Sequence, residues 1–428
     1  MKYILILFLF MLLSGPRLNF PDLNLSFSFF LALLSPFVLF KEQKISNQLY
    51  FLFALLLCYF IYSIFNSIIN NVIGFASIEQ SLRVIIWFLA SLSITFLYKK
   101  HYGKSRFLLP LSNHILWSLL VNCIFVVLVM FVPLVREFST VFLSNNERMI
   151  SLVNTSVRAT DLVMGGGSVA SVVFSVFFVY SLCLYQFTKS KLAIISILFS
   201  ILGAIFTGRT GFLLIIASYI PTVCLANYYL KGSFKFFVTL YKFLLTVLVI
   251  LFILVSFFFI AKIISPEMAK VVFDKSFSWS FEMFINLYET GSLSTDSTTV
   301  LMSMYDSVSF SDVFSLFGSS LSGRDRDVYY LHTDVGYLRL LYTSGILGFI
   351  LVFSKYFYLI ISCLKFLFNR ELEPFKMAMV ISMFYYIFAI FVVNFKEYHE
   401  GIRSGFPLLM IFSIVLLSFG NKINGKYE

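Results

Sequence analysis

The sequence predicts an all-α polytopic membrane protein, a single transmembrane domain over residues 1–428 with about twelve helices. Hydrophobic residues make up 60% of the chain and charged residues 12%, whereas about a quarter of the residues in a soluble domain are charged. The hydrophobic residues also occur in blocks of roughly 17–25, the length that crosses a bilayer as a helix. The alternating apolar and polar positions of an outer-membrane barrel do not occur in the sequence.

The predicted spans follow one another along the whole chain. They cover residues 3–15, 24–40, 50–73, 82–98, 114–134, 166–187, 192–207, 211–229, 239–264, 334–356, 377–395 and 404–419. The first follows Lys2 in the manner of a signal peptide, but the segment Gly15-Pro16-Arg17 is not an A-x-A-like cleavage site. We therefore expect the first helix to remain in the protein as a signal anchor.

The net charge of +11 does not predict a nucleic-acid partner, because most basic residues fall in short loops on one side of the predicted membrane. These loops contain Lys41, Lys44, Lys99, Lys100, Lys104, Arg106, Lys189, Lys191, Lys231, Lys235, Lys365, Arg370, Lys376, Lys422 and Lys426. Loops rich in lysine and arginine remain in the cytoplasm. We therefore expect both termini on the cytoplasmic side.

Two long loops then fall on the outer side, over residues 135–165 and 265–333. Loops of this length are functional or disordered. In the second loop, the apolar residues of 277–288 recur at helical spacing, which suits a helix on the membrane surface. Residues 295–308 predict a second short helix capped by Asp296 or Ser297. We expect this loop to form a small helical cap over the outer end of the bundle.

In the first loop, Arg158 and Asp161 precede a run of three glycines at 165–167. Arg148 lies earlier in the same loop. The glycines suit a hinge or a point of close approach, because glycine has no Cβ. The pattern is more typical of a flexible loop end.

Arg209 is the first candidate for a binding residue. It stands in the segment Thr207–Gly211, which joins two apolar spans with almost no loop. The glycines at 208 and 211 allow a tight turn and a close approach of the backbone to a ligand. A guanidinium group binds phosphate through parallel hydrogen bonds. The alternative is an arginine that extends to the membrane interface from a turn and has no ligand.

A second polar cluster precedes the predicted span 334–356. Arg324 and Arg326 alternate with two aspartates, and His332 and Asp334 follow within a few residues. The arginines either bind phosphate or form local ion pairs in a solvated loop. Histidine has an ordinary pKa of about 6.5, which suits a general base. The alternative for His332 is an interfacial histidine with no chemical role.

Arg339 lies about one turn or more inside the same span. A charge at that depth is costly, so we expect it to face the bundle interior and have a partner. Asp334 is the only acid nearby in sequence, and its spacing is poorer than the three or four residues that bring helical side chains together. An acid from another helix and a bound phosphate are the other possible partners, and a structural ion pair is the alternative to a functional role.

The short outer loop from Lys396 to Arg403 is dense in ionisable groups. We expect it beside the start of the span 334–356 if the bundle is compact. Glu397, His399 and Glu400 suit sugar hydroxyl groups, whereas Lys396 or Arg403 suits a phosphate. A hydrated turn is the alternative.

Metal and cofactor motifs are absent from the sequence. It contains no Walker lysine loop, HExxH or GxSxG segment. Asp325-Arg326-Asp327 has the paired-aspartate pattern of metal-dependent sugar transferases, but the adjacent arginines compete with a cation. The five cysteines form no CxxC pair, so we predict neither zinc nor disulfides. We therefore predict no metal and no cofactor.

Several of these segments carry a resemblance to a known family. They are Thr207–Gly211 after an apolar span, the long loop 265–333, FSLFG at 314–318, HTDVGY at 332–337 and LRLLYTSGILG at 338–348. Their order, spacing and sidedness resemble those of bacterial O-antigen and capsule repeat-unit polymerases (Wzy-type) and of O-antigen ligases. The resemblance covers residues 199–353 and the overall topology. One difference is that residues 295–312 contain no arginine, which ligase relatives often have before the FxxxG-like segment.

The resemblance implies a membrane-embedded glycosyltransferase of the GT-C type in the bacterial inner membrane. Such an enzyme transfers a glycan from a polyprenyl diphosphate on the outer face, without a metal. Arg209, with Arg324, Arg326 or Arg339, would stabilise the departing diphosphate. His332 would remove a proton from the acceptor hydroxyl. Asp334 would orient His332 or act as the base itself.

The resemblance implies several partners and leaves alternatives to the polymerase. The partners are polyprenyl-diphosphate-linked oligosaccharide, membrane lipids, a chain-length regulator and a flippase. The nearest alternative is an O-antigen ligase, but the segment DVGYLRLLYTSGILG resembles polymerases more than it resembles ligases. The alternative from another class is a lipid-linked oligosaccharide flippase, which has short outer loops, unlike this chain. A polymer exporter without catalysis has no specific support.

Overall fold

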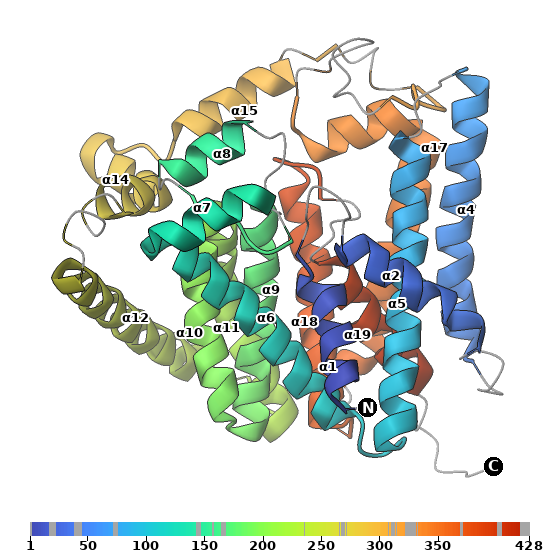
Figure 1. Ribbon diagram of the computed structural model, residues 1–428, viewed down its shortest axis with the longest axis horizontal. Coiled ribbons are helices and arrows are strands. Elements are labelled where there is room, and N and C mark those ends of the chain that lie inside the picture. Colours follow the sequence, from blue (N-terminus) through green and yellow to red (C-terminus); the bar gives the residue numbers. More distant parts are fainter. Residues whose placement is uncertain are drawn as a thin grey trace. The chain divides into compact units, whose positions relative to one another are not determined.

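The computed structural model describes residues 2–16, 23–37, 45–71, 76–142, 147–155, 158–163, 168–234, 236–264, 266, 270, 272–306, 308–309, 313, 315–321, 331, 333–368, 371–399 and 405–419. The regular structure within these residues is helical (Figure 1). The chain groups into two compact units. Unit 1 comprises Met1–Phe27, Tyr98–Ser292 and Leu367–Tyr385, and unit 2 comprises Ser28–Leu97, Leu293–Phe366 and Tyr386–Glu428.

Seven helices in the described part of the chain are long and apolar enough to cross a membrane, so the protein is a polytopic membrane protein. They are α4 (Asn47–Ile69), α5 (Ala76–Tyr102), α6 (Leu108–Phe131), α9 (Ser168–Thr188), α11 (Arg209–Lys231), α17 (Gly336–Leu367) and α18 (Pro374–Val393). The shorter apolar helices are α1 (Lys2–Ser14), α2 (Leu23–Leu33), α10 (Lys191–Thr207) and α19 (Phe406–Phe419). A further apolar helix, α12 (Phe236–Ile264), has 29 residues.

The core of unit 1 is the helix α9, which packs against both α10 and α11 (Figure 1). Gly211 on α11 has no room for a side chain, because a Cβ there would overlap the backbone of Ser171 on α9. The backbone N–H of Gly211 also donates to the Ser171 hydroxyl, at 3.1 Å. Gly211 therefore serves close packing of two helices, whereas the sequence suggested close approach to a ligand.

In unit 2, the helix α17 is broken at Gly345, whose backbone is left-handed with φ +63°. Residues 315–321 lie along the break, and Ser319 N–H donates to the carbonyl of Tyr342 while Ile346 N–H donates to that of Ser315. The Tyr62 hydroxyl donates to the Ser344 carbonyl at 2.6 Å. The break therefore leaves these backbone groups paired, as an apolar environment requires.

The break changes the interpretation of the predicted span 334–356. The helix continues to Leu367, and the part after Gly345 alone is about 33 Å long, enough to cross a bilayer. Arg339 lies on the short part before the break. Arg339 therefore precedes the part of α17 that is long enough by itself to cross the bilayer.

Both predicted long loops contain helices. Residues 135–165 include most of α7 (Pro133–Phe142) and all of α8 (Glu147–Asn154). Residues 265–333 include a π-helical turn (Val272–Phe277), α14 (Ser278–Thr290) and α15 (Asp296–Asp306). The two predicted helices of the second loop are thus confirmed. The predicted cap is wrong by one residue, because the hydroxyl of Thr295 accepts from Thr298 N–H at 3.3 Å.

Candidate functional site

Arg209 is the first residue of α11. The preceding helix α10 ends at Thr207, and Gly208 between them has extended backbone with φ −178°. The Arg209 residue is 8% exposed. A buried guanidinium group requires a partner, because removing a charge from water is costly.

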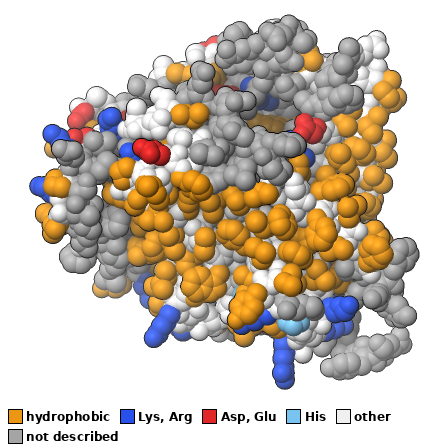
Figure 2. Space-filling model, in the orientation of Figure 1, with side chains coloured by type: hydrophobic (Ala, Val, Ile, Leu, Met, Phe, Trp, Pro, Cys, Tyr) orange, Lys and Arg blue, Asp and Glu red, His pale blue; other side chains and the backbone are white. Residues whose placement is uncertain are grey.

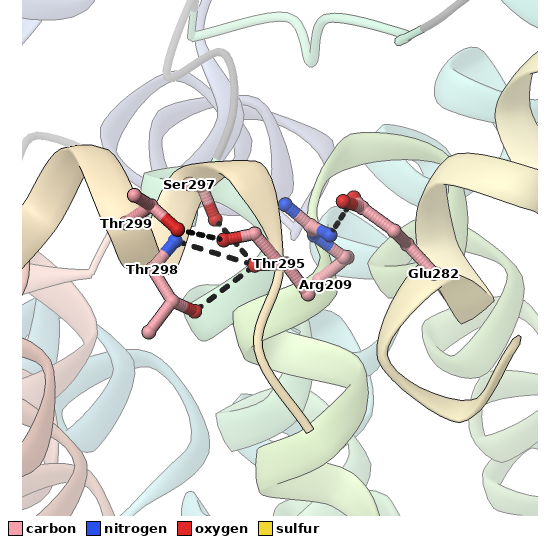
Figure 3. Close-up of polar contacts among 6 residues, drawn as sticks. All are labelled: Arg209, Glu282, Thr295, Ser297, Thr298 and Thr299. Carbon is pink, nitrogen blue, oxygen red and sulfur yellow. Dashed lines mark hydrogen bonds and ion pairs between the residues drawn. The ribbon is translucent and has the colours of Figure 1, made fainter. Parts of the chain in front are cut away.

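Three side chains from the two predicted long loops surround Arg209. Glu282 on α14 forms an ion pair and hydrogen bond with its guanidinium group (Figure 3). The Cζ atom of Arg209 lies 4.7 Å from the ring centroid of Trp279, also on α14. The Cζ atom of Arg158 lies 3.9 Å from the same centroid. Two cations and one carboxylate therefore meet around one indole ring, and we name Arg158, Arg209, Trp279 and Glu282 the arginine corner.

The segment that carries Arg158 is packed into unit 1. Ala159 N–H donates to the carbonyl of Phe206 near the end of α10, at 2.8 Å. The buried carboxylate of Asp161 accepts from the Asn122 side chain of α6 at 3.3 Å. Asn122 lies about two and a half turns before the end of α6. Residues 158–163 are therefore packed against unit 1, while the glycines 165–167, for which a flexible loop end was predicted, lie outside the described residues.

The helix α14 is held beside α10 and α11 by its own buried side. The Ser280 hydroxyl donates to the carbonyl of Ile205 at 2.9 Å. The ring of Phe281 lies edge-on to Phe212 of α11, with centroids 5.2 Å apart. Trp279 and Glu282 are three residues apart and lie on one side of the helix. This packing fixes both of them toward the start of α11.

The chemistry of the arginine corner suits an anion. Each guanidinium group donates in a planar fork that matches phosphate oxygens. The indole ring favours cations over its face. The carboxylate of Glu282 pairs with one of the two guanidinium groups. Both arginines carry the donor geometry that phosphate groups match.

A second arginine occupies the start of α17 in unit 2. Arg339 is 6% exposed, and its Nε donates to the carbonyl of Thr333 at 2.7 Å. Its Nη2 lies 3.6 Å from the carboxylate of Asp334. The spacing of five residues is possible because Asp334 precedes the helix and the side chain of Arg339 points back toward the helix start. These contacts fit the structural ion pair that the sequence left open.

The short loop after α18 lies against the start of α17, as predicted. Tyr337 N–H donates to the carbonyl of Asn394 at 3.1 Å. A Cβ at Gly336 would overlap the side chain of Asn394. Gln80 donates to the Tyr398 hydroxyl at 2.6 Å. Glu397 is half-buried in this turn.

Among the described residues of this loop, His399 is the most buried ionisable group, at 2% exposure. Its backbone N–H donates to the side chain of Asn394 at 3.0 Å. Neither ring nitrogen has a hydrogen-bond partner within the described part of the chain. Burial lowers the pKa of His399 to about 3, so the imidazole is neutral and offers one donor and one acceptor.

Several predicted site residues lie outside the described residues. They are His332, Arg324, Arg326 and Glu400. Arg403 also lies outside them. Within the described residues, no three His, Cys, Asp or Glu side chains are placed to hold a metal ion.

Sequence reasoning missed Trp279, Glu282 and the role of Arg158. Trp279 and Glu282 could have been found, because their spacing places them on one side of a predicted helix. Arg158 carries no comparable signal. Its position depends on the contacts of residues 159–162 with α6 and α10.

Comparison of the chain with protein-family models, curated proteins and solved structures finds no match. The chemistry of the two clusters is therefore the basis for a functional proposal.

Proposed function

We propose that the protein is a metal-independent glycosyltransferase that polymerises polysaccharide at the outer face of the bacterial inner membrane. It would join oligosaccharide repeat units that are linked to polyprenyl diphosphate. The observation that carries the proposal is the convergence of Arg158 and Arg209 on Trp279. The proposal includes a GT-C-like fold of about twelve spans with both termini in the cytoplasm.

The arginine corner would hold the donor diphosphate. In the reaction, an acceptor hydroxyl oxygen bonds to the anomeric carbon, and the bond from that carbon to the diphosphate breaks. Negative charge then grows on the departing diphosphate. Arg158 and Arg209 would neutralise this charge, a role that metal ions fill in other transferases.

Glu282 is the partner of Arg209 when the arginine corner holds no ligand. Its carboxylate holds the guanidinium group of Arg209. A diphosphate carries more negative charge than a carboxylate and offers more acceptor oxygens. We expect it to compete with Glu282 for Arg209.

His332 would accept the proton of the acceptor hydroxyl, or Asp334 would orient it or act in its place. The neutral imidazole of His399, with Glu397 and Glu400, would bind sugar hydroxyls. Arg324 and Arg326 remain candidates for the diphosphate. A chain-length regulator and a flippase would be partners.

A surface-polysaccharide gel tests the proposal. A host lacking the gene would be complemented with the wild type, Arg158→Ala, Arg209→Ala or His332→Ala. Arg106→Ala is the matched control, because Arg106 is an exposed arginine of a short loop. We expect the wild type and the control to restore a ladder of repeat units, and the three test variants to leave a single-repeat band.

Other gel patterns would contradict the polymerase. Long lipid-linked chains that never reach the lipid core would indicate a ligase. Loss of even the single-repeat band would indicate a flippase. A full ladder from Arg158→Ala and Arg209→Ala would show that the arginine corner has no role in the reaction.

A further inference from the structure

The helix α7 packs with its polar side inward and its apolar side outward. Arg136 donates to the carbonyls of Val129 and Met130 at the end of α6, at 3.2 and 2.5 Å. Ser139, on the same side, is fully buried. Leu134 and Phe138, one turn apart on the other side, are 76% and 56% exposed. A helix beside water has the opposite arrangement.

The exposed side of α7 continues an apolar stripe on α6. Trp117, Val121 and Leu128 are exposed on α6, and their spacing of four and seven residues places them on one side of the helix. The helix α6 is about 36 Å long, which already exceeds the hydrocarbon core of about 30 Å. The chain after Val132 has therefore reached the edge of that core. In Figure 2 the side chains over α6 on the near face are mostly hydrophobic.

The helix α14 also combines buried polar groups with exposed apolar ones. In its first turn Trp279 and Glu282 contact Arg209, and Ser280 contacts α10. In its later turns Phe284 and Tyr288, one turn apart, are exposed, Tyr288 by 91%. The preceding helix α12 also exposes Phe259 and Ile263 near its end. The apolar surface of α14 thus follows an apolar helix long enough to cross a bilayer.

From these contacts we infer that α7 and α14 lie in the membrane interface, with Leu134, Phe138, Phe284 and Tyr288 among the lipids. The partner is the bilayer itself, and the two helices form an interfacial collar of unit 1. Such helices bury their apolar face about 5–10 Å into the boundary between headgroups and acyl chains. The later turns of α14 meet lipid, while its first turn holds Trp279 and Glu282. The collar therefore places the arginine corner at the depth of lipid phosphates.

Nitroxide labels on single cysteines test this inference in lipid nanodiscs without substrate. The full chain would carry Cys58→Ser to remove its exposed thiol. Labels at Phe138→Cys and Tyr288→Cys would be compared with labels at the adjacent exposed positions, Glu137→Cys and Glu289→Cys. The measured quantity is the ratio of collisions with oxygen, which enriches in lipid, to collisions with a water-soluble nickel complex.

We expect a several-fold higher ratio at 138 and 288 than at 137 and 289. Ratios that are equally low at both positions of each pair would place the helices in water and overturn the inference. Labels at 138 and 288 shielded from both reagents would also overturn it, because a protein surface would then cover them. Since no glycan is involved, failure here is distinct from failure of the polysaccharide gel.

Discussion

Arg209 in unit 1 and Arg339 in unit 2 are both buried near the start of an apolar helix, yet their surroundings differ. The partners of Arg209 are Glu282 and Trp279, with Arg158 over the same ring, and they come from two loops distant in sequence. Arg339 contacts Thr333 and Asp334, immediately before its helix.

This difference is the basis of the roles that we propose for the two arginines. Thr333 and Asp334 hold the side chain of Arg339 against the start of its own helix α17. At the arginine corner, two guanidinium groups share one indole ring and are held there by residues from two distant segments. We therefore propose ligand binding for Arg209 and structural support for Arg339.

The largest expected effect is that of a substitution at Gly345, where α17 is broken between Arg339 and the part of the helix that spans the membrane. Gly345→Ala places a Cβ on a residue with left-handed backbone, and this Cβ overlaps the backbone of Gly318 and Leu316. We expect a loss of about 3 kcal/mol or more of folding stability, measured by thermal unfolding in detergent. Gly291→Ala is the control, since Gly291 has φ +72° but open space around a Cβ. We expect it to lose only about 1 kcal/mol, and equal losses would show that the break is not tightly packed.

Arg339→Ala sharpens the comparison directly. It removes the hydrogen bond to Thr333 and the ion pair with Asp334, so we expect a loss of about 2 kcal/mol of stability. Activity per folded molecule should remain close to that of the wild type, which polysaccharide yield normalised to folded protein measures. A stable variant without activity would instead make Arg339 a ligand-binding residue.

His399 predicts a smaller, pH-dependent effect in unit 2. Its pKa is about 3 in the folded protein, against about 6.5 in an unfolded chain, because burial disfavours the charged ring. Between these values the unfolded chain binds one more proton, so stability is complete above pH 6.5 and falls as the pH decreases toward 3. We expect the wild type to lose about 1 kcal/mol between pH 7.5 and 5.5 from this residue.

The substitution His399→Gln should remove that part of the pH dependence. His101→Gln, at an exposed histidine, should leave it unchanged. Thermal unfolding at the two pH values measures both. An unchanged pH dependence in His399→Gln would mean that the imidazole is not buried as a neutral ring.

The smallest effect is expected from Glu282→Gln at the arginine corner. The change removes the carboxylate that competes with an anion for Arg209. We expect a short-chain polyprenyl diphosphate to bind a few-fold more tightly, as measured by calorimetry. Glu289→Gln on the exposed side of α14 should not change the affinity. Weaker binding to Glu282→Gln would show that Glu282 positions Arg209 for the ligand and does not compete with it.

The helices were predicted well because an apolar block long enough to span a bilayer forms few structures other than a helix. The predicted spans 114–134, 211–229 and 377–395 correspond to α6, α11 and α18, with shifted ends. The break at Gly345 was missed, because a single glycine in an apolar run becomes a break only through its contact with residues 315–321. The helix α7 was missed because it lies inside a stretch assigned to a loop.

The candidate site was predicted in part. Arg209 was selected from its tight turn, and the approach of the short loop to α17 was anticipated. The partners of Arg209 were not predicted, because ion pairs between distant loops depend on packing that hydropathy does not encode. His332, Arg324, Arg326 and Glu400 lie outside the described residues, so their roles stay predictions.

The fluorescence of Trp279 tests the central assignment most directly. Trp87→Phe and Trp117→Phe leave Trp279 as the single tryptophan of the chain. Its ring contacts Arg158 and Arg209. Titration with farnesyl diphosphate should give a saturable change in this background. The change should persist in Arg339→Ala and disappear in Arg209→Ala. A change that survives Arg209→Ala, or that farnesol without the diphosphate reproduces, would contradict the assignment of the arginine corner as a diphosphate site.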